Sequence, residues 1–67
     1  MAAGTTRIAQ KVGEEGVELA LAAVSGDRER VIDEAADLIY HAVVLLAEQR
    51  IGLSDVVARL ESRHKPG

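Results

Sequence analysis

The chain has 67 residues, of which 48% are hydrophobic, and a formal charge of −3 at pH 7. This length allows a single domain, residues 1–67, and so short a chain is usually only marginally stable without a staple or a partner. Cysteine is absent, which excludes disulfides and cysteine-based zinc sites. The acidic charge argues against nucleic-acid binding, and no apolar run reaches the roughly 20 residues of a membrane helix. We therefore expect a cytoplasmic protein that gains stability by oligomerisation.

A first helix is predicted from about Thr6 to about Val24. The apolar side chains that recur there at helical spacing are Ile8, Val12, Leu19 and Ala23. Thr5 or Thr6 is a suitable N-cap, and Ser25-Gly26 supplies a stop signal. Gly13 and Gly16 lie inside this helix, each at a cost of roughly 0.5–1 kcal/mol relative to alanine. Two interior glycines indicate a group that approaches the helix closely, although a contact between small residues of two helices explains them as well.

A second helix is predicted from Asp27, a suitable N-cap, to about Arg50. The stretch from Ala35 to Ala47 is apolar nearly all round, and a helix of this kind is buried on every side. A chain this short cannot bury such a helix by itself, so the pattern predicts a partner subunit. The short turn between the first two helices predicts an antiparallel hairpin.

A short third helix is predicted after Gly52, which ends the second one. Ser54 is the expected N-cap, the helix ends near His64, and residues 65–67 form a tail. The predicted fold is therefore all-α, an antiparallel helical hairpin plus a short third helix, which assembles into an oligomeric helix bundle.

Acidic residues gather at two places in the predicted hairpin. Glu14, Glu15 and Glu18 lie on the first helix at spacings where like charges repel across a turn. Glu34 and Asp37 form a second acidic pair in an otherwise apolar stretch. Carboxylates on a buried helix are costly unless they are paired or bind a metal. A hairpin can bring both groups face to face, and such a set of oxygens suits Mg²⁺ or Mn²⁺.

A solvated helix surface is the alternative interpretation of these carboxylates. Lys11 would then neutralise a glutamate one turn away, and Arg28, Arg30 or an arginine of a partner subunit would neutralise the second acidic pair. His41, one turn after Asp37, orients that carboxylate or contacts a phosphate in the first interpretation. In the second it is a core histidine bonded to an acidic neighbour. Two acidic groups in an apolar setting together favour the metal interpretation.

The segment IAQKVGEEGVE, residues 8–18, resembles the signature of the phosphoribosyl-ATP pyrophosphohydrolases. Further matches are EAADLIYH at 34–41, VLL at 44–46 and IGLSDV at 51–56, so the resemblance covers about residues 4–64. The glutamates alone are less specific, because the wider MazG-like superfamily of nucleotide pyrophosphatases shares them. Family members usually carry a further helix before the segment that matches Ala3-Gly4, and we expect this N-terminal helix to be missing here.

The resemblance implies an α-helical homodimer or larger assembly that hydrolyses phosphoribosyl-ATP to phosphoribosyl-AMP and pyrophosphate with Mg²⁺. This reaction is the second step of histidine biosynthesis. The residues that match the family's metal ligands are Glu15, Glu18, Glu34 and Asp37. Glu14 matches a further ligand or the catalytic group that positions the attacking water. Lys11 matches a phosphate contact, and we predict that His41 also binds substrate.

Two other functions fit the same sequence. A MazG-like enzyme for another nucleoside triphosphate would use the same carboxylates, because these bind phosphates that all such substrates share. The matches at Tyr40-His41 and at residues 52–55 favour the histidine pathway instead. A non-catalytic helical oligomerisation module is the other alternative. The retained carboxylates argue against it, because a protein released from catalysis has no reason to keep charges on a buried face.

Overall fold

The computed structural model describes residues 2–64, and these residues form three helices. Helix α1 spans Ala2–Ser25, α2 spans Arg28–Glu48 and α3 spans Leu53–Arg63. No strand occurs within residues 2–64, so the predicted all-α class is confirmed. The expected tail, residues 65–67, lies outside the described part of the chain. None of the described helices combines the length and the apolar character needed to cross a membrane.

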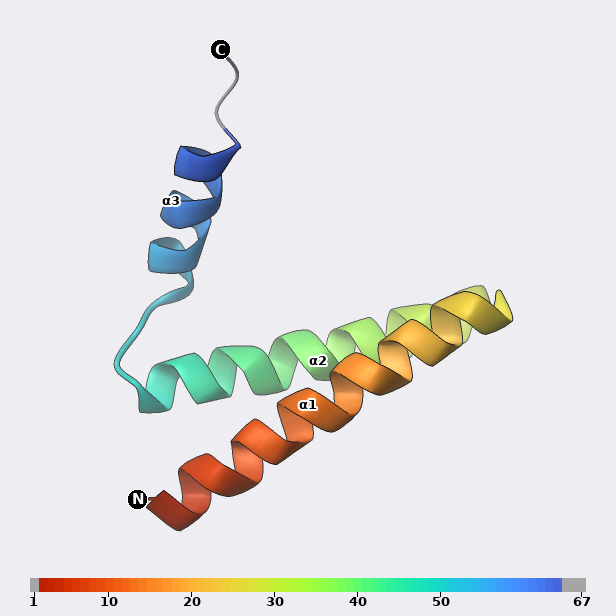
Figure 1. Cartoon of the computed structure of the whole chain (residues 1–67), viewed down its shortest axis with the longest axis horizontal. Helices are drawn as coiled ribbons and strands as arrows, with labels where there is room; N and C mark the ends of the chain where they lie inside the picture. Colours follow the sequence, from red (N-terminus) through yellow and green to blue (C-terminus); the bar gives the residue numbers. More distant parts are fainter. Residues whose placement is uncertain (1, 65–67) are drawn as a thin grey trace.

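Helices α1 and α2 lie side by side and run in opposite directions (Figure 1). The chain reverses at Gly26, whose φ of +78° is the left-handed conformation that glycine adopts at helix ends. The Gly26 N–H donates to the carbonyls of Ala22 and Ala23, at 3.2 Å each. Asp27 then caps α2, because its Oδ1 accepts a hydrogen bond from the Arg30 N–H at 3.2 Å. The predicted stop and the predicted cap are both confirmed.

The start of α1 differs from the prediction, because the helix begins at Ala2 rather than near Thr6. Alanine has the highest helix propensity of all residues, which extends the helix by about one turn. Thr5, one of the two expected caps, lies inside the helix instead. Its Oγ1 donates a hydrogen bond to Glu48 Oε1 at 3.0 Å and so joins the beginning of α1 to the end of α2.

The start of α3 also differs from the prediction. Gly52 is the N-cap, and its N–H donates to Asp55 Oδ2 at 3.0 Å, so α3 begins at Leu53. Ser54, the expected cap, therefore lies in the first turn of the helix. Figure 1 shows α3 extending away from the α1–α2 pair, whose two helices pack against each other.

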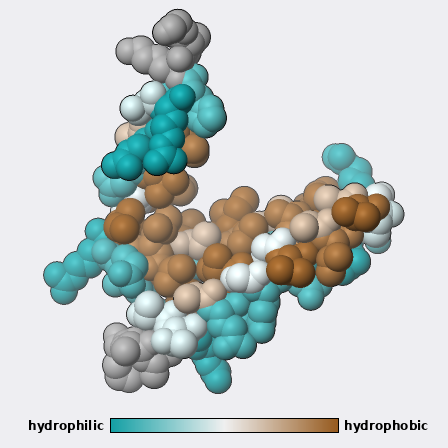
Figure 2. All heavy atoms as spheres, in the orientation of Figure 1, coloured by the Kyte–Doolittle hydropathy of each residue, from teal (hydrophilic) through white to brown (hydrophobic). Residues whose placement is uncertain are grey.

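The packing of α1 against α2 buries few side chains. Among residues 4–64 the buried ones are Ala22, with none of its surface exposed, and Glu15, with 9% exposed. Helix α2 has no buried residue, so the expected burial of Ala35 to Ala47 on every side does not occur within one chain. Figure 2 shows hydrophobic residues over α2 and the base of α3, and hydrophilic residues along the lower edge of α1. The large apolar side chains that remain exposed are Val17, Leu21, Val24, Ile32, Ile39, Tyr40, Val43, Ile51, Leu53, Val57 and Leu60.

Candidate functional site

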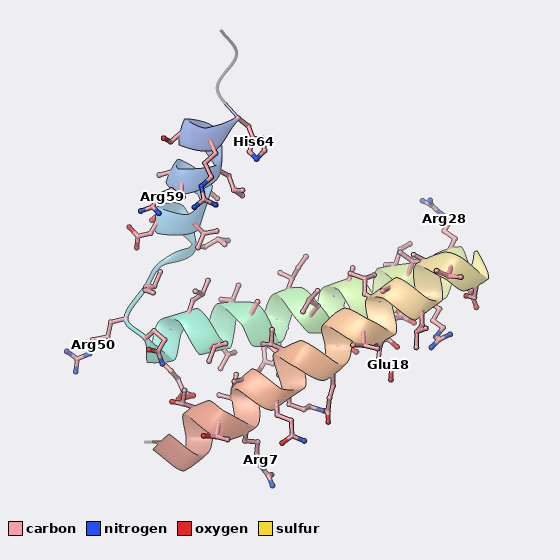
Figure 3. The ribbon with its side chains drawn as sticks, viewed as in Figure 1. Arg7, Glu18, Arg28, Arg50, Arg59 and His64 are labelled. Carbon is pink, nitrogen blue, oxygen red and sulfur yellow. The ribbon has the colours of Figure 1, made fainter. Side chains whose placement is uncertain are left out.

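The predicted site residues of α1 lie along one flank of the α1–α2 pair. At about 100° per residue, Lys11, Glu14 and Glu18 fall within an arc of about 60°. Glu15 lies next to this arc, on the side of α1 that faces α2, and is buried there. Figure 3 shows Glu18 projecting from α1 on the same side as Arg7, the lower edge that is hydrophilic in Figure 2.

Three predicted site residues of α2 share a flank in the same way. Glu34, Asp37 and His41 fall within an arc of about 60° on that helix. Glu34 and His41 are half-buried and Asp37 is exposed. Within residues 2–64, the side chains of Glu34 and Asp37 form no hydrogen bond or ion pair.

The contact between Glu15 and His41 joins the two flanks. Oε1 of Glu15 lies 2.5 Å from Nδ1 of His41. The pair lacks hydrogen-bond geometry, however, and this Oε1 has no hydrogen-bond partner among the described residues. His41 Nδ1 also lies 2.9 Å from the backbone carbonyl oxygen of Asp37, which serves as the acceptor for a proton on that nitrogen. A buried carboxylate oxygen without a donor costs about 1–3 kcal/mol or more, so this position would be stabilised by a cation.

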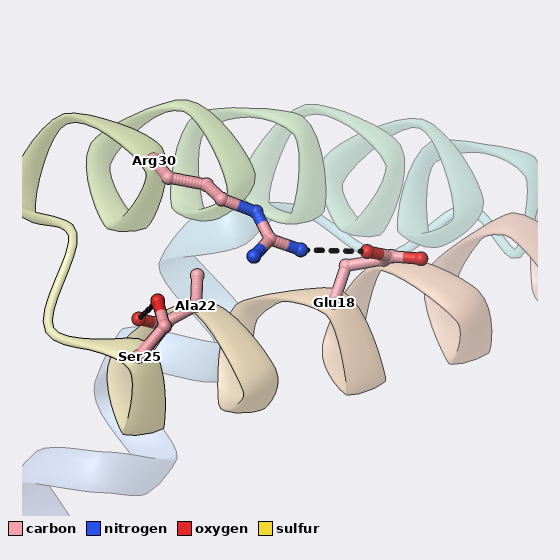
Figure 4. A network of polar contacts seen from close by, with 4 residues as sticks. All are labelled: Glu18, Ala22, Ser25 and Arg30. Carbon is pink, nitrogen blue, oxygen red and sulfur yellow. Dashed lines mark hydrogen bonds and ion pairs between the residues drawn. The ribbon is translucent and has the colours of Figure 1, made fainter.

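A second contact between the helices engages Glu18. Its Oε2 lies 3.4 Å from Arg30 Nη2, and both side chains are about half exposed (Figure 4). In the solvated-surface interpretation, Arg30 would instead neutralise Glu34 or Asp37 of its own helix. An exposed ion pair of this kind contributes about 1 kcal/mol at most, so Glu18 can exchange Arg30 for another cation at small cost.

Glu14 and Lys11 occupy the exposed part of the α1 flank. Glu14 Oε2 accepts a hydrogen bond from Gln10 Nε2 at 3.0 Å. Lys11 lines a hollow of about 400 Å³ together with Arg7, Ile8, Gln10 and His41. Arg7 was not among the predicted site residues, and its position one turn before Lys11 is the signal that could have indicated it.

The metal-binding prediction concerns Glu15, Glu18, Glu34 and Asp37. Within residues 2–64, no three His, Asp or Glu side chains are close enough together to hold a metal ion. The structure thus aligns the four carboxylates along facing flanks without bringing them to one point. Their chemistry fits a hard cation, since all four side chains would offer carboxylate oxygens as ligands. One of these oxygens, Oε1 of Glu15, is buried and accepts no hydrogen bond from the described residues. The metal assignment stays a prediction.

Comparison with known proteins finds a family match over nearly the whole chain. The family model described as phosphoribosyl-ATP pyrophosphohydrolase matches residues 1–64. The chain is similar to the histidine biosynthesis bifunctional protein HisIE of Vibrio cholerae, with 62% identity over 64 residues. Proteins of the same name from Photobacterium profundum and Campylobacter jejuni are 62% and 63% identical over 63 and 62 residues. These matches cover 96%, 94% and 92% of this chain, which spans about 30% of the length of each relative.

Proposed function

The chain belongs to the phosphoribosyl-ATP pyrophosphohydrolase family, and we propose that it catalyses the reaction for which the family is named. The products are phosphoribosyl-AMP and pyrophosphate, and the reaction serves histidine biosynthesis. The observation that carries this proposal is the family match over residues 1–64, supported by relatives at about 62% identity that are named for histidine biosynthesis. The chain spans about 30% of the length of those relatives, which are named as bifunctional proteins. The proposal therefore concerns only the hydrolysis of phosphoribosyl-ATP.

The proposal includes a magnesium ion held by Glu15, Glu18, Glu34 and Asp37. The donor set supports it, because Mg²⁺ prefers carboxylate oxygens, and Mn²⁺ accepts the same donors. The Oε1 of buried Glu15, which accepts no hydrogen bond within residues 2–64, and the weak Glu18–Arg30 pair also support it. When bound, Mg²⁺ would neutralise charge on the phosphate oxygens and on the leaving pyrophosphate.

The remaining residues bind the substrate and position water. Glu14 is exposed and accepts a hydrogen bond from a water molecule that adds to phosphorus as pyrophosphate leaves. The Lys11 ammonium group contacts phosphate oxygens from the same flank. His41 Nδ1 is held beside the Asp37 carbonyl and Glu15, so Nε2 is the ring nitrogen that reaches the substrate.

The proposal also includes assembly of the antiparallel α1–α2 hairpin with a second copy into a helix bundle. Its support is the small buried core, in which Ala22 is the one fully buried residue among residues 4–64. Exposed apolar residues of α2 such as Ile39, which is 61% exposed, would gain burial in such an assembly. Apolar burial contributes about 25 cal/mol per Å², so a partner would add the stability that one chain lacks.

The substrate is tested by comparing turnover of phosphoribosyl-ATP with that of a panel of plain nucleoside triphosphates in Mg²⁺. We expect kcat/KM for phosphoribosyl-ATP to exceed that for the panel by roughly 100-fold or more, because a site built around an additional polar group rejects substrates without it. A preference for the panel would assign the chain to MazG-like chemistry. Binding of Mg²⁺ without hydrolysis of any of these substrates would indicate a non-catalytic module.

A further inference from the structure

A hollow of about 400 Å³ lies on the flank of the pair, towards the beginning of α1. Its walls are Arg7, Ile8, Gln10 and Lys11 of α1, and His41 closes it from α2. Arg7 and Lys11 are one turn apart, and none of the residues that line the hollow is acidic. The hollow is therefore a positively charged region beside a group of carboxylates.

Arg7 and Lys11 have no carboxylate partner in the described part of the chain. The ion pairs there join Arg30 to Glu18 and His41 to Glu15. Like charges one turn apart repel each other, so this pair of cations gains from an anion that contacts both. Arg7 and Lys11 are exposed, and a planar guanidinium group binds two oxygens of a phosphate at once.

His41 connects this hollow to the carboxylates, because it lines the hollow and also contacts Glu15. At 1.5 Å per residue, Arg7 lies about 12 Å from Glu15 along the axis of α1. Arg7 and Glu18 project from the same side of that helix (Figure 3). A substrate with phosphate at both ends can therefore lie along this flank, with its triphosphate at the carboxylates and its other phosphate at Arg7.

We propose that Arg7, with Lys11 beside it, binds the single phosphate of the substrate's phosphoribosyl group. This inference rests on the proposed function, which supplies a substrate with two phosphate-bearing ends. Arg7 then determines specificity, because a plain nucleoside triphosphate has no second phosphate to place in the hollow. The residue contacts the substrate away from the bond that breaks, so it affects substrate binding and leaves the hydrolytic step unchanged.

The kinetic test combines Arg7→Gln with removal of the phosphate from the phosphoribosyl group of the substrate. We expect Arg7→Gln to raise KM for phosphoribosyl-ATP roughly 10- to 100-fold with little change in kcat, which is the range for a lost charge-assisted hydrogen bond. On the analogue without that phosphate, Arg7→Gln should behave like the wild type. Arg28→Gln is the matched control, because Arg28 is exposed at the start of α2 and points away from this flank (Figure 3). Equal losses on both substrates, or no loss on either, would overturn the proposal.

A binding measurement in EDTA tests the same site without hydrolysis. Ribose 5-phosphate should bind saturably and shift the NMR signals of Arg7, Lys11 and His41, in the wild type and in Arg28→Gln but not in Arg7→Gln. Absence of these shifts in the wild type would overturn the inference even if phosphoribosyl-ATP is hydrolysed. A wild type that fails to hydrolyse phosphoribosyl-ATP but binds ribose 5-phosphate through Arg7 would refute the proposed function and support the phosphate site.

Discussion

Glu15 is the acidic residue whose surroundings depart most from those of an ordinary surface carboxylate. It is the one buried charged residue among residues 4–64, and one of its oxygens lacks a hydrogen-bond donor. Buried polar groups are nearly always satisfied in folded proteins, and the exceptions tend to occur at functional sites. A cation bound at this oxygen would offset the free-energy cost of burying it without a hydrogen bond. The stability of the folded protein would then depend on metal binding.

That linkage leads to a prediction for Asp37→Ala. Mg²⁺ at about 100 times its dissociation constant should raise the melting temperature of the wild type by roughly 10–20 °C, because a ligand that binds only the folded state stabilises it. Asp37→Ala should abolish most of this rise, since it removes one of the four proposed ligands. Thermal melting followed by circular dichroism, with and without Mg²⁺, measures both effects.

Asp33→Ala is the matched control for this experiment. Asp33 is exposed on the same helix, one turn before Asp37, and lies outside the proposed set of ligands. Asp33→Ala changes the net charge by the same amount as Asp37→Ala. It should leave most of the Mg²⁺-induced rise in melting temperature intact. Equal loss in both variants would mean that Mg²⁺ responds to the general charge of α2, and the specific site would then be wrong.

Helical spacing in the sequence indicated which residues share a flank of each helix but not which of them touch across the pair. The predicted acidic neighbour of His41 was Asp37, whereas the observed carboxylate contact is with Glu15 of the other helix. Arg30 likewise pairs with Glu18 across the interface. Helical spacing places residues around one axis, but contacts between two helices depend on how far each has slid along the other. That offset is set by the turn and by packing, which a single sequence does not give.

At the scale of the elements, local signals located the turn well and the helix starts less well. Gly26 and Asp27 each act through their own backbone and nearest neighbours, so their roles follow from residue type and position. The start of α1 at Ala2 depends in addition on contact with α2, since Thr5 donates to Glu48. Thr5 and Glu48 lie almost equally far from Gly26 along the chain, which is visible only once the two helices are known to be antiparallel.

Gly16 gives a prediction for the stability of α1. A Cβ added at Gly16 would meet no atom within 4 Å, so no other part of the described chain occupies that space. Gly16→Ala should therefore raise the free energy of unfolding by about 0.5–1 kcal/mol, because alanine restricts the unfolded chain and favours helix. Urea unfolding measures the change.

Gly26→Ala is the opposite control, since its φ of +78° is unfavourable for any residue with a Cβ. It should lower the free energy of unfolding by about 1 kcal/mol. Destabilisation by Gly16→Ala as well would contradict the open space around Gly16. It would show that another subunit or segment packs closely against α1.

At the scale of the whole molecule, one chain leaves most of its large apolar side chains exposed. The sequence predicted that residues from Ala35 to Ala47 need burial, and within one chain α2 has no buried residue. The pattern therefore predicts a partner subunit, which stays a prediction, and it does not predict which surface such a partner would cover. The direction in which α3 extends was also not predictable, because its short apolar stripe fits more than one neighbour.

Ile39→Glu tests the proposed assembly. Ile39 is 61% exposed on α2, so a glutamate there is tolerated in a single chain but places a charge in an apolar interface between copies. We expect sedimentation equilibrium to show a shift from oligomer to monomer and the melting temperature to fall. Ile39→Leu keeps the apolar surface and should stay oligomeric. An unchanged oligomer in Ile39→Glu would exclude this face of α2 from the interface.

The central claim is that carboxylates on the α1–α2 flank support magnesium-dependent hydrolysis of phosphoribosyl-ATP. The most direct measurement is pyrophosphate release from phosphoribosyl-ATP by the protein in Mg²⁺ and in saturating EDTA. We predict release of one pyrophosphate per phosphoribosyl-AMP in Mg²⁺ and loss of activity in EDTA, because unscreened glutamates repel the triphosphate. Full activity in saturating EDTA, or no pyrophosphate release with Mg²⁺ present, would contradict this account.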